Sequence, residues 1–194
     1  DLAACMNTNP VMIYFGQEIG EKGMYKEGFS GIDGRTTIFD YWSLPEYNKW
    51  VNGGAFDGGR LSEEQKDLRE FYMKLLNFRL QSDAVQNGNF YDLMWKNNGG
   101  NLDSDKIYAY TRYTENEKLL FVINFDFTQT HTFRLILGDH ALKTMKCPLT
   151  GTMTMTEVFE SDFSDSFATE DVLEHGLPIS ILPNSALVFR LEWK

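Results

Sequence analysis

The chain has 194 residues, 42% of them hydrophobic and 14% aromatic, which is enough apolar material for one large domain or two small ones. Its formal charge is −10, from 28 acidic and 18 basic residues. Because nucleic-acid binding needs a basic surface, this balance excludes nucleic acid as a partner and favours a neutral or cationic one. No apolar run approaches the ~20 residues that span a bilayer, so no membrane segment is expected.

The cysteines and histidines form no metal-binding pattern. Cys5 and Cys147 lie near opposite ends of the chain without a CxxC spacing, and the three histidines are scattered. We expect two unpaired, buried thiols. The acidic segment 160–171 lacks the Gly and Glu positions of an EF-hand loop, so we expect an exposed loop there and no calcium site. The sequence predicts no cofactor for this chain.

The first half of the chain contains one predicted strand and one predicted helix. "PVMIYFG" at 10–16 is a short apolar run typical of a strand buried on both faces, and six glycines between Gly16 and Gly34 predict an ordered loop after it. Ser62 and Gln65 form a capping box at the start of a helix that we expect to end near Gln81. Such a strand followed by a helix indicates a parallel βα unit, which cannot form a sheet by itself.

The predicted helix has one apolar face. Its members follow the i, i+3, i+4, i+7, i+8 spacing and are Leu68, Phe71, Tyr72, Leu75 and Leu76. This face must be covered by another part of the protein or by a second copy. For the isolated chain we expect self-association or partial disorder in residues 1–60.

Beyond residue 98 the pattern changes to short apolar strands separated by polar turns. Strands are predicted at about 89–95, 107–113, 119–125, 131–137, 152–158, 178–182 and 186–192. "TENE" at 114–117 predicts a hairpin turn between the second and third of these strands. The alternation of Ile107 and Ala109 with Tyr108 and Tyr110 indicates a sheet with one face toward a core.

Four stretches, in order, resemble the C-terminal part of the α-amylase family of glycoside hydrolases. "PVMIYFGQEIG" (10–20) is similar to the eighth barrel strand and the following turn, and "GIDGRTTIFDYW" (31–42) to the Asp, Arg and Trp segment after it. "LREFYMKLLNFRLQSDAVQNGNF" (68–90) resembles the last barrel helix, with its arginine at Arg79. "IYAYTRYTENEKLLFVINF" (107–125) resembles the first hairpin of the C-terminal antiparallel domain.

The resemblance implies an α+β fold: the last βα unit of a TIM-type barrel, followed by an all-β antiparallel sandwich that is Greek-key-like. It assigns residues 1–88 to the C-terminal portion of the (β/α)₈ catalytic barrel and residues 89–194 to the β domain. Such a barrel takes about 250 residues, more than the whole chain. The family's aspartate nucleophile, glutamate acid/base and Asn-His-Asp motif have no match here. Retaining hydrolysis requires two carboxyls about 5–5.5 Å apart, so this chain alone is expected to be inactive.

The resemblance places three candidate substrate-binding residues in the loop that follows the barrel strand. Asp33 and Arg35 resemble the pair that bonds a glucosyl unit, although their spacing is shorter than in the family; the alternative is that Arg35 forms a salt bridge with Asp33 or Asp40. Trp42 is expected either to stack on a sugar ring or to pack under the loop. Glu18 matches a structural position in the turn, and no catalytic residue is assigned.

The expected function is therefore that of a C-terminal piece of a retaining hydrolase acting on α-1,4-linked α-glucans. Its expected partners are an α-glucan or malto-oligosaccharide and the remainder of the barrel, and any calcium would belong to the parent enzyme. Hydrolase, transglycosylase and isomerase members of the family share this layout. The alternatives are a non-catalytic α-glucan-binding module and a β domain that only caps the barrel. No exposed aromatic triplet is evident, and the sequence assigns no compartment.

Overall fold

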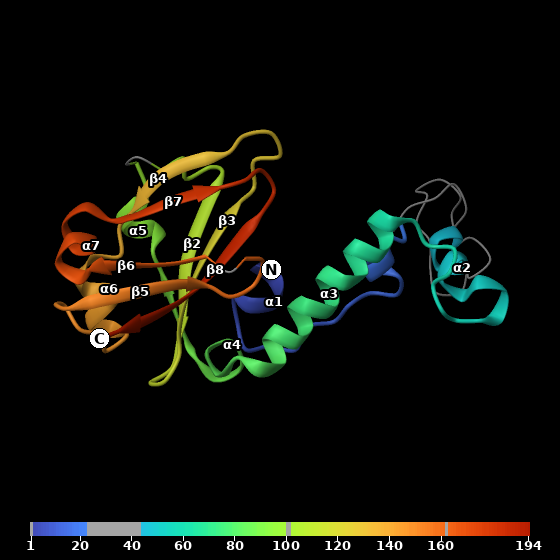
Figure 1. Ribbon diagram of the computed structural model, residues 1–194, viewed down its shortest axis with the longest axis horizontal. Helices are drawn as coiled ribbons and strands as arrows, with labels where there is room; N and C mark the ends of the chain where they lie inside the picture. Colours follow the sequence, from blue (N-terminus) through green and yellow to red (C-terminus); the bar gives the residue numbers. More distant parts are fainter. Residues whose placement is uncertain (1, 23–43, 100–101, 162) are drawn as a thin grey trace. The chain divides into compact units, whose positions relative to one another are not determined.

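The computed structural model describes residues 2–22, 44–99, 102–161 and 163–194 (Figure 1). The chain forms two compact units, one of Asp1–Asn9 with Phe78–Lys194 and the other of Pro10–Asn77. This division shows which parts of the chain fold compactly together, and it does not test the predicted domain boundary. The assignment of residues 1–88 to a catalytic barrel and of 89–194 to a β domain stays a prediction.

The larger unit contains two antiparallel sheets. One has six strands in the order β1-β2-β3-β8-β5-β6, and the other pairs β4 with β7. The strands are β1 (Asn89–Asp92), β2 (Ile107–Tyr113), β3 (Lys118–Asn124), β4 (His131–Leu135), β5 (Thr152–Glu157), β6 (Ser164–Ala168), β7 (Leu177–Ile181) and β8 (Ala186–Trp193). The turn at 114–117 joins β2 to β3 as a hairpin, as predicted. The predicted antiparallel β domain is confirmed.

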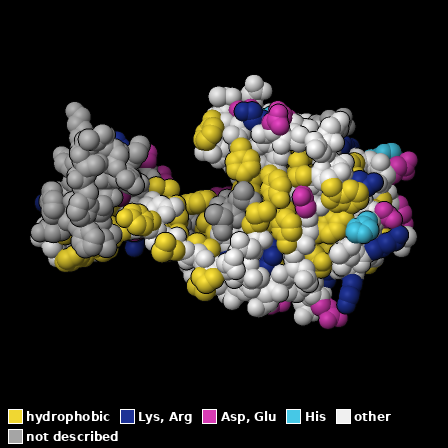
Figure 2. Space-filling view, turned by 180° about the vertical axis from the view of Figure 1, so that it is seen from behind, with side chains coloured by type: hydrophobic (Ala, Val, Ile, Leu, Met, Phe, Trp, Pro, Cys, Tyr) yellow, Lys and Arg dark blue, Asp and Glu magenta, His cyan; other side chains and the backbone are white. Residues whose placement is uncertain are grey.

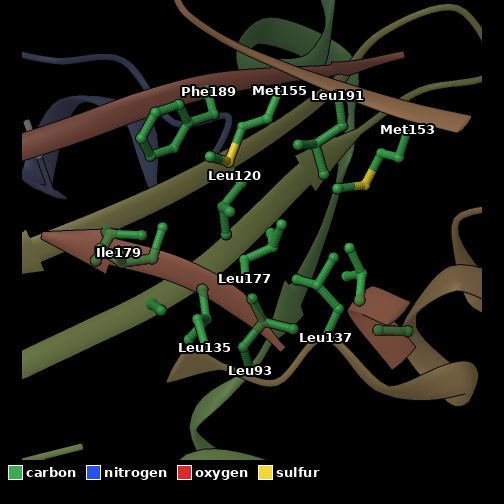
Figure 3. Close-up of a cluster of buried hydrophobic side chains, with 14 of the residues drawn as sticks. Leu93, Leu120, Leu135, Leu137, Met153, Met155, Leu177, Ile179, Phe189 and Leu191 are labelled. Atoms are coloured by element: carbon green, nitrogen blue, oxygen red, sulfur yellow. The ribbon is translucent and has the colours of Figure 1, made fainter. Parts of the chain in front are cut away.

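The main core of this unit lies between the two sheets. Figure 3 shows Leu135 and Leu177 of the small sheet among side chains of the large sheet, including Leu120 and Met155, and each of the four is at most 1% exposed. Alternate residues of each strand supply this core, because side chains on a strand point to opposite faces in turn. Burying the two apolar faces against each other is what stabilises the pair of sheets.

The opposite face of the large sheet is also covered, which the sequence alternation did not predict. Tyr110 is fully buried and stacks on Phe121 with ring centroids 4.7 Å apart. Arg112 is 3% exposed and donates hydrogen bonds to the carbonyls of Ala84 and Val85, at 3.2 and 3.1 Å. Both carbonyls belong to the short helix α4 (Asp83–Asn87), so β2 is buried on both faces.

The prediction of an exposed loop over 160–171 is wrong in part. The structure places β6 at Ser164–Ala168, paired with β5, and begins α7 (Thr169–His175) directly after it. Because β6 is an edge strand with mostly exposed side chains, its polar sequence lacks the apolar alternation that marks a strand. Two further short helices that the sequence did not predict are α5 (Met94–Asn97) and α6 (Gly138–Thr144).

The N-terminal segment belongs to the larger unit. It carries α1 (Leu2–Cys5) and is held by Arg79, whose guanidinium donates to the carbonyls of Ala4, Asn7 and Asn9. These three hydrogen bonds, all donated by one guanidinium, fix the position of the segment. The arginine of the "LNFR" motif therefore has a structural role within this unit.

In the smaller unit, the described residues form mainly helices. They are η1 (Gln17–Ile19), α2 (Pro45–Val51), η3 (Asn52–Gly54) and α3 (Glu63–Gln81), whose last residues belong to the larger unit. The predicted capping box is present, with Ser62 N donating to Gln65 Oε1 at 3.0 Å and Gln65 N to Ser62 Oγ at 3.4 Å. The start and end of the predicted helix are thus confirmed.

The predicted buried strand over 10–16 is not formed in the described residues. The segment has no strand partner there, and Met12 is 83% exposed. The physical reason is that a strand buried on both faces needs neighbouring strands, and the described part of the smaller unit contains none. On α3, Leu75 is buried and Leu68, Phe71, Tyr72 and Leu76 are half-buried, so its apolar face is only partly covered.

Hydrophobic side chains also remain at the surface of the larger unit (Figure 2). The most exposed are Phe127 at 77%, Leu80 at 71%, Leu182 at 66% and Trp95 at 55%. Phe127 and Leu182 lie on loops that leave β3 and β7, whereas Trp95 lies on α5.

Candidate functional site

The three residues predicted to bind substrate, Asp33, Arg35 and Trp42, all lie outside the described residues, as does Asp40. The structure does describe the segments on either side of this loop, from Pro10 to Lys22 and from Leu44 onward. The substrate-binding roles of the three residues stay predictions.

The turn after residues 10–15 has a fixed backbone geometry. Gly16 has φ +77°, and a Cβ on it would lie 2.7 Å from the Cβ of Glu21, so only glycine fits without movement. The amides of Ile19 and Glu21 both donate to the Gly16 carbonyl, at 3.1 and 2.9 Å. Ile19 is 1% exposed and anchors the turn in the unit.

Glu21 joins this turn to α2. Its Oε2 accepts hydrogen bonds from the backbone amides of Glu46 and Tyr47, at 3.0 and 2.9 Å. These amides are free of intrahelical acceptors because they lie in the first turn of the helix, where a carboxylate is also favoured by the helix dipole. Glu21 thereby fixes the start of α2 beside the turn.

Glu46 links α2 to α3 and to the turn. It pairs with Lys49 at 2.5 Å and accepts a hydrogen bond from Gln65 at 2.7 Å, and Gln65 also donates to the Ile19 carbonyl at 2.9 Å. The hydrogen bond from Lys49, with that from Gln65, lowers the pKa of Glu46 below its ordinary value. Glu46 is therefore ionised and structural at neutral pH.

A cavity of about 590 Å³ opens within the smaller unit, and aromatic rings form much of its wall. The lining residues are Ile13, Tyr14, Phe15, Gly16, Glu18, Tyr47, Trp50, Arg69, Tyr72, Met73, Leu76 and Asn77. Phe15 and Tyr47 have ring centroids 4.2 Å apart, and Tyr47 and Trp50 5.8 Å apart. An aromatic wall with a few polar groups is typical of small-ligand sites.

The polar groups at this cavity do not form a hydrolytic pair. Among its described lining residues Glu18 is the one carboxylate, whereas retaining hydrolysis needs two. The nearby hydroxyl of Tyr72 accepts a hydrogen bond from Gln17 Nε2 at 2.7 Å, which ties the turn to α3. The arrangement can hold apolar or sugar-like groups, but these residues do not supply an acid and a nucleophile.

Within the part of the chain that the structure describes, no group of three His, Cys, Asp or Glu side chains is placed to hold a metal ion. Among the same residues, no helix is both long and apolar enough to cross a membrane. Cys5 and Cys147 are free and buried, and burial raises the pKa of each thiol to about 11. The expectation of two unpaired, buried thiols is confirmed.

Comparison with known proteins shows what this fold is similar to. Residues 100–192 match the family model described as the alpha amylase C-terminal all-beta domain. No curated protein matches the sequence significantly. The antiparallel β architecture of the larger unit is therefore that of an α-amylase-type C-terminal domain.

Solved structures match over nearly the whole chain. AmyP, crystallised with maltose, is 14% identical with a TM-score of 0.60 over 96% of this chain and 32% of that one. Trehalulose synthase MutB from Pseudomonas mesoacidophila MX-45 is 15% identical, with a TM-score of 0.54 over 98% and 37%. A mutant of isomaltulose synthase from Erwinia rhapontici NX5, crystallised with sucrose, is 16% identical, with a TM-score of 0.55 over 97% and 36%.

Residues 100–192 thus match the C-terminal domain of the α-amylase family, as the stretch 107–125 predicts. The chain spans about a third of the length of the solved structures that it matches. At these identities the structural likeness shows a shared fold and leaves the reaction open.

Proposed function

We propose that this chain is the C-terminal part of a retaining glycoside hydrolase that acts on α-glucans through α-1,4-glucosidic bonds. The observation that carries the proposal is the match of residues 100–192 to the α-amylase C-terminal domain. It is supported by AmyP, a protein of similar fold that was crystallised with maltose and with maltotriose. No cofactor is proposed for this segment.

In this proposal the catalytic carboxylates belong to a part of the protein outside residues 1–194. The sequence contains neither the nucleophile motif nor the Asn-His-Asp motif, and the aromatic cavity offers the single carboxylate of Glu18. Asp33, Arg35 and Trp42 are proposed to contact the substrate once the barrel is complete, because loops that follow barrel strands line the active site.

The same proposal explains the partly covered apolar surface of the smaller unit. The half-buried face of α3, together with Met12 and the cavity, is where the remaining strands and helices of a barrel would pack. An apolar stripe of this kind is stabilising only when another element covers it. The remainder of the barrel is therefore the proposed partner of residues 10–77.

The test is to express two proteins and assay both on maltoheptaose and soluble starch. The first is the chain 1–194, and the second is the longer product encoded by the same reading frame. We expect no reducing-sugar release from the first and hydrolysis by the second, with retention of the α-anomeric configuration seen by NMR. Hydrolysis by the 194-residue chain alone, or a longer product without the Asp, Glu and Asp motifs, would contradict the proposal.

A second candidate function concerns the β domain by itself, as a non-catalytic α-glucan-binding or barrel-capping module. It is favoured by the dense core of the larger unit, which is complete without residues 10–77. Deleting residues 98–194 from the longer protein separates the two roles. A capping role predicts lost stability with an unchanged substrate profile, whereas a binding role predicts weaker adsorption to granular starch.

A further inference from the structure

A surface cluster on the larger unit consists of Tyr91, Trp95, Lys96 and His140, here called the Trp95 cluster. Its members come from three elements: Tyr91 from β1, Trp95 and Lys96 from α5, and His140 from α6. The sequence did not predict it, because His140 is 49 positions away from Tyr91. The cluster shares no residue with the cavity of residues 10–77, and its residues are not among those proposed to contact the rest of the barrel.

The position of Trp95 is fixed by a buried amide next to it. Asn97 is 4% exposed, and its Nδ2 donates to the carbonyls of Leu93 and Ile136, at 2.8 and 2.9 Å. Its Oδ1 accepts from the Ile136 amide at 2.8 Å. The two bonds to Ile136 fasten α5 to the segment between β4 and α6, so a helix of only four residues holds its indole in one place.

The rim of the cluster carries paired polar groups. The Tyr91 hydroxyl and His140 Nδ1 are 2.7 Å apart, and the His140 ring lies perpendicular to Trp95 with centroids 6.1 Å apart. Burial raises the pKa of the Tyr91 hydroxyl, so the phenol is protonated at neutral pH. A phenol and an imidazole can each donate to or accept from a ligand hydroxyl.

The indole itself is the apolar part of the site. Trp95 is 55% exposed although its ring is large and apolar, and the Lys96 ammonium lies 5.2 Å from the ring centroid. Tyr91, by contrast, packs partly against the core. An exposed aromatic plane with a hydroxyl and an imidazole at its edge matches a sugar ring, which has apolar C–H faces and a polar periphery.

The charge of the protein narrows the class of ligand. The net charge of −10 disfavours anionic ligands, and the nearby Asp139 is already paired with Lys143 at 2.8 Å. The more exposed Phe127, at 77%, has no polar ring partner among the described contacts. A neutral polyhydroxylated ligand therefore fits the cluster better than a phosphate or an acidic chain.

We propose that the Trp95 cluster is a surface binding site for an α-glucan chain, in which one glucosyl ring stacks on Trp95 while Tyr91 and His140 bond its hydroxyls. The identity of the sugar rests on the proposed action on α-glucans, whereas the existence of the site rests on the geometry of the cluster. Binding here would keep the enzyme on a polymeric substrate without contributing to bond cleavage.

The test uses the whole 194-residue chain in native gels that contain soluble starch, with gels containing laminarin, a β-glucan, run in parallel. We expect the wild-type chain to be retarded by starch, and Trp95→Ala to bind about tenfold more weakly. Phe127→Ala is the matched control, since it removes an exposed aromatic ring at another place on the unit, and it should be retarded like the wild type.

A second measurement covers the case in which Trp95→Ala alters folding. Tyr91→Phe keeps the ring but removes the hydroxyl that meets His140, and we expect about threefold weaker binding to maltoheptaose with an unchanged melting temperature. Fluorescence quenching by maltoheptaose should be present in the wild type and lost in Trp95→Phe, which keeps an aromatic ring at the site.

The outcomes separate this site from the proposed function. Absence of starch retardation, or equal retardation of Trp95→Ala and wild type, would overturn the site and leave the hydrolase proposal intact. Retardation by laminarin but not starch, lost in Trp95→Ala, would overturn the α-glucan assignment of the cluster. Failure of the longer protein to cleave starch, with Trp95-dependent retardation retained, would overturn the hydrolase proposal alone.

Discussion

The two compact units differ in how completely they bury their own apolar side chains. In the larger unit, most members of the core between the sheets are at most 2% exposed, and helix α4 covers the opposite face of β2. In the smaller unit, Ile19 and Leu75 are buried, but Met12 is 83% exposed and Met73 53% exposed. The first has the core of an independent domain, whereas the described residues of the second do not form one.

This difference follows from the kind of element that each unit contains. Antiparallel strands joined by short hairpins satisfy one another's backbone groups within about a hundred residues. In the proposed function residues 10–77 are part of a barrel, in which a strand and its helix obtain their hydrogen bonds and their apolar partners from other βα units. A piece of a sandwich can therefore complete itself, whereas a piece of a barrel leaves exposed apolar surface.

The largest expected effect tests whether the core between the sheets determines stability. Leu120 is fully buried there, and Leu120→Ala should lower the free energy of unfolding of the larger unit by about 2–5 kcal/mol. Ile19→Ala, made in the smaller unit at a residue 1% exposed, should leave that transition unchanged and instead speed proteolysis within residues 10–77. Urea unfolding followed by circular dichroism, with timed limited proteolysis, measures both. Equal shifts of the main transition would show that the units do not unfold separately.

The next effect concerns Arg112 and Arg190. Each lies directly opposite Leu119 on a neighbouring strand, so both side chains are on the same face of the large sheet. Arg112 donates to the carbonyls of Ala84 and Val85, so Arg112→Met leaves buried acceptors unpaired and should cost about 2–3 kcal/mol. The matched control is Arg190→Met, because Arg190 is half exposed and lies 3.7 Å from Glu117; it should cost less than about 1 kcal/mol. Thermal melts of both variants check the order, and a larger loss for Arg190→Met would contradict the role given to α4.

The comparison also shows which parts of the fold a sequence can predict. The strands that form the centre of the large sheet, β2, β3 and β8, were predicted within one residue, because both the apolar content and the turns between them are local signals. β6 was missed because an edge strand buries few apolar side chains. Its hydroxyl pairs with β5, such as Thr154 with Ser166, follow from the pairing of the two strands and not from either sequence alone. Residues 10–16 carried a strand signal, but the strand needs partners that the described residues lack.

The candidate sites show the same limit. Asp33, Arg35 and Trp42 were proposed from the order of family-like stretches, and they lie outside the described residues. The Trp95 cluster depends on a contact between β1 and α6, and no spacing in the sequence brings Tyr91 and His140 together. The one local signal was the Tyr and Trp four positions apart, which by itself is equally consistent with packing in a core.

A smaller effect is expected from Asp126, in the loop after β3. Its carboxylate accepts hydrogen bonds from the Thr128 hydroxyl at 2.7 Å and the Thr128 amide at 2.8 Å, and these lower its pKa well below the ordinary value of 3.8. A carboxylate whose pKa is lowered in the folded state stabilises the fold when the pH is above the ordinary pKa. This contribution is lost as the pH falls from the ordinary pKa toward the lowered one. Asp126→Asn should therefore reduce the urea midpoint at pH 7 but change it much less at pH 2.5. The exposed Asp105→Asn is the control, and an equal loss at both pH values would exclude this titration as the cause.

The smallest effect on stability should come from Met73→Lys on α3, where the side chain is 53% exposed and lines the cavity of the smaller unit. Its free energy of unfolding should stay within about 0.5 kcal/mol of the wild type. The same change should reduce self-association, because it places a charge on the apolar surface that another part of the protein is proposed to cover. Sedimentation velocity at rising protein concentration measures this.

Asp67→Asn, on the same helix, is the control because it changes the net charge equally without removing apolar surface. If both variants associate like the wild type, residues 10–77 do not mediate contact between copies, and the exposed apolar surface of this unit is tolerated in the monomer.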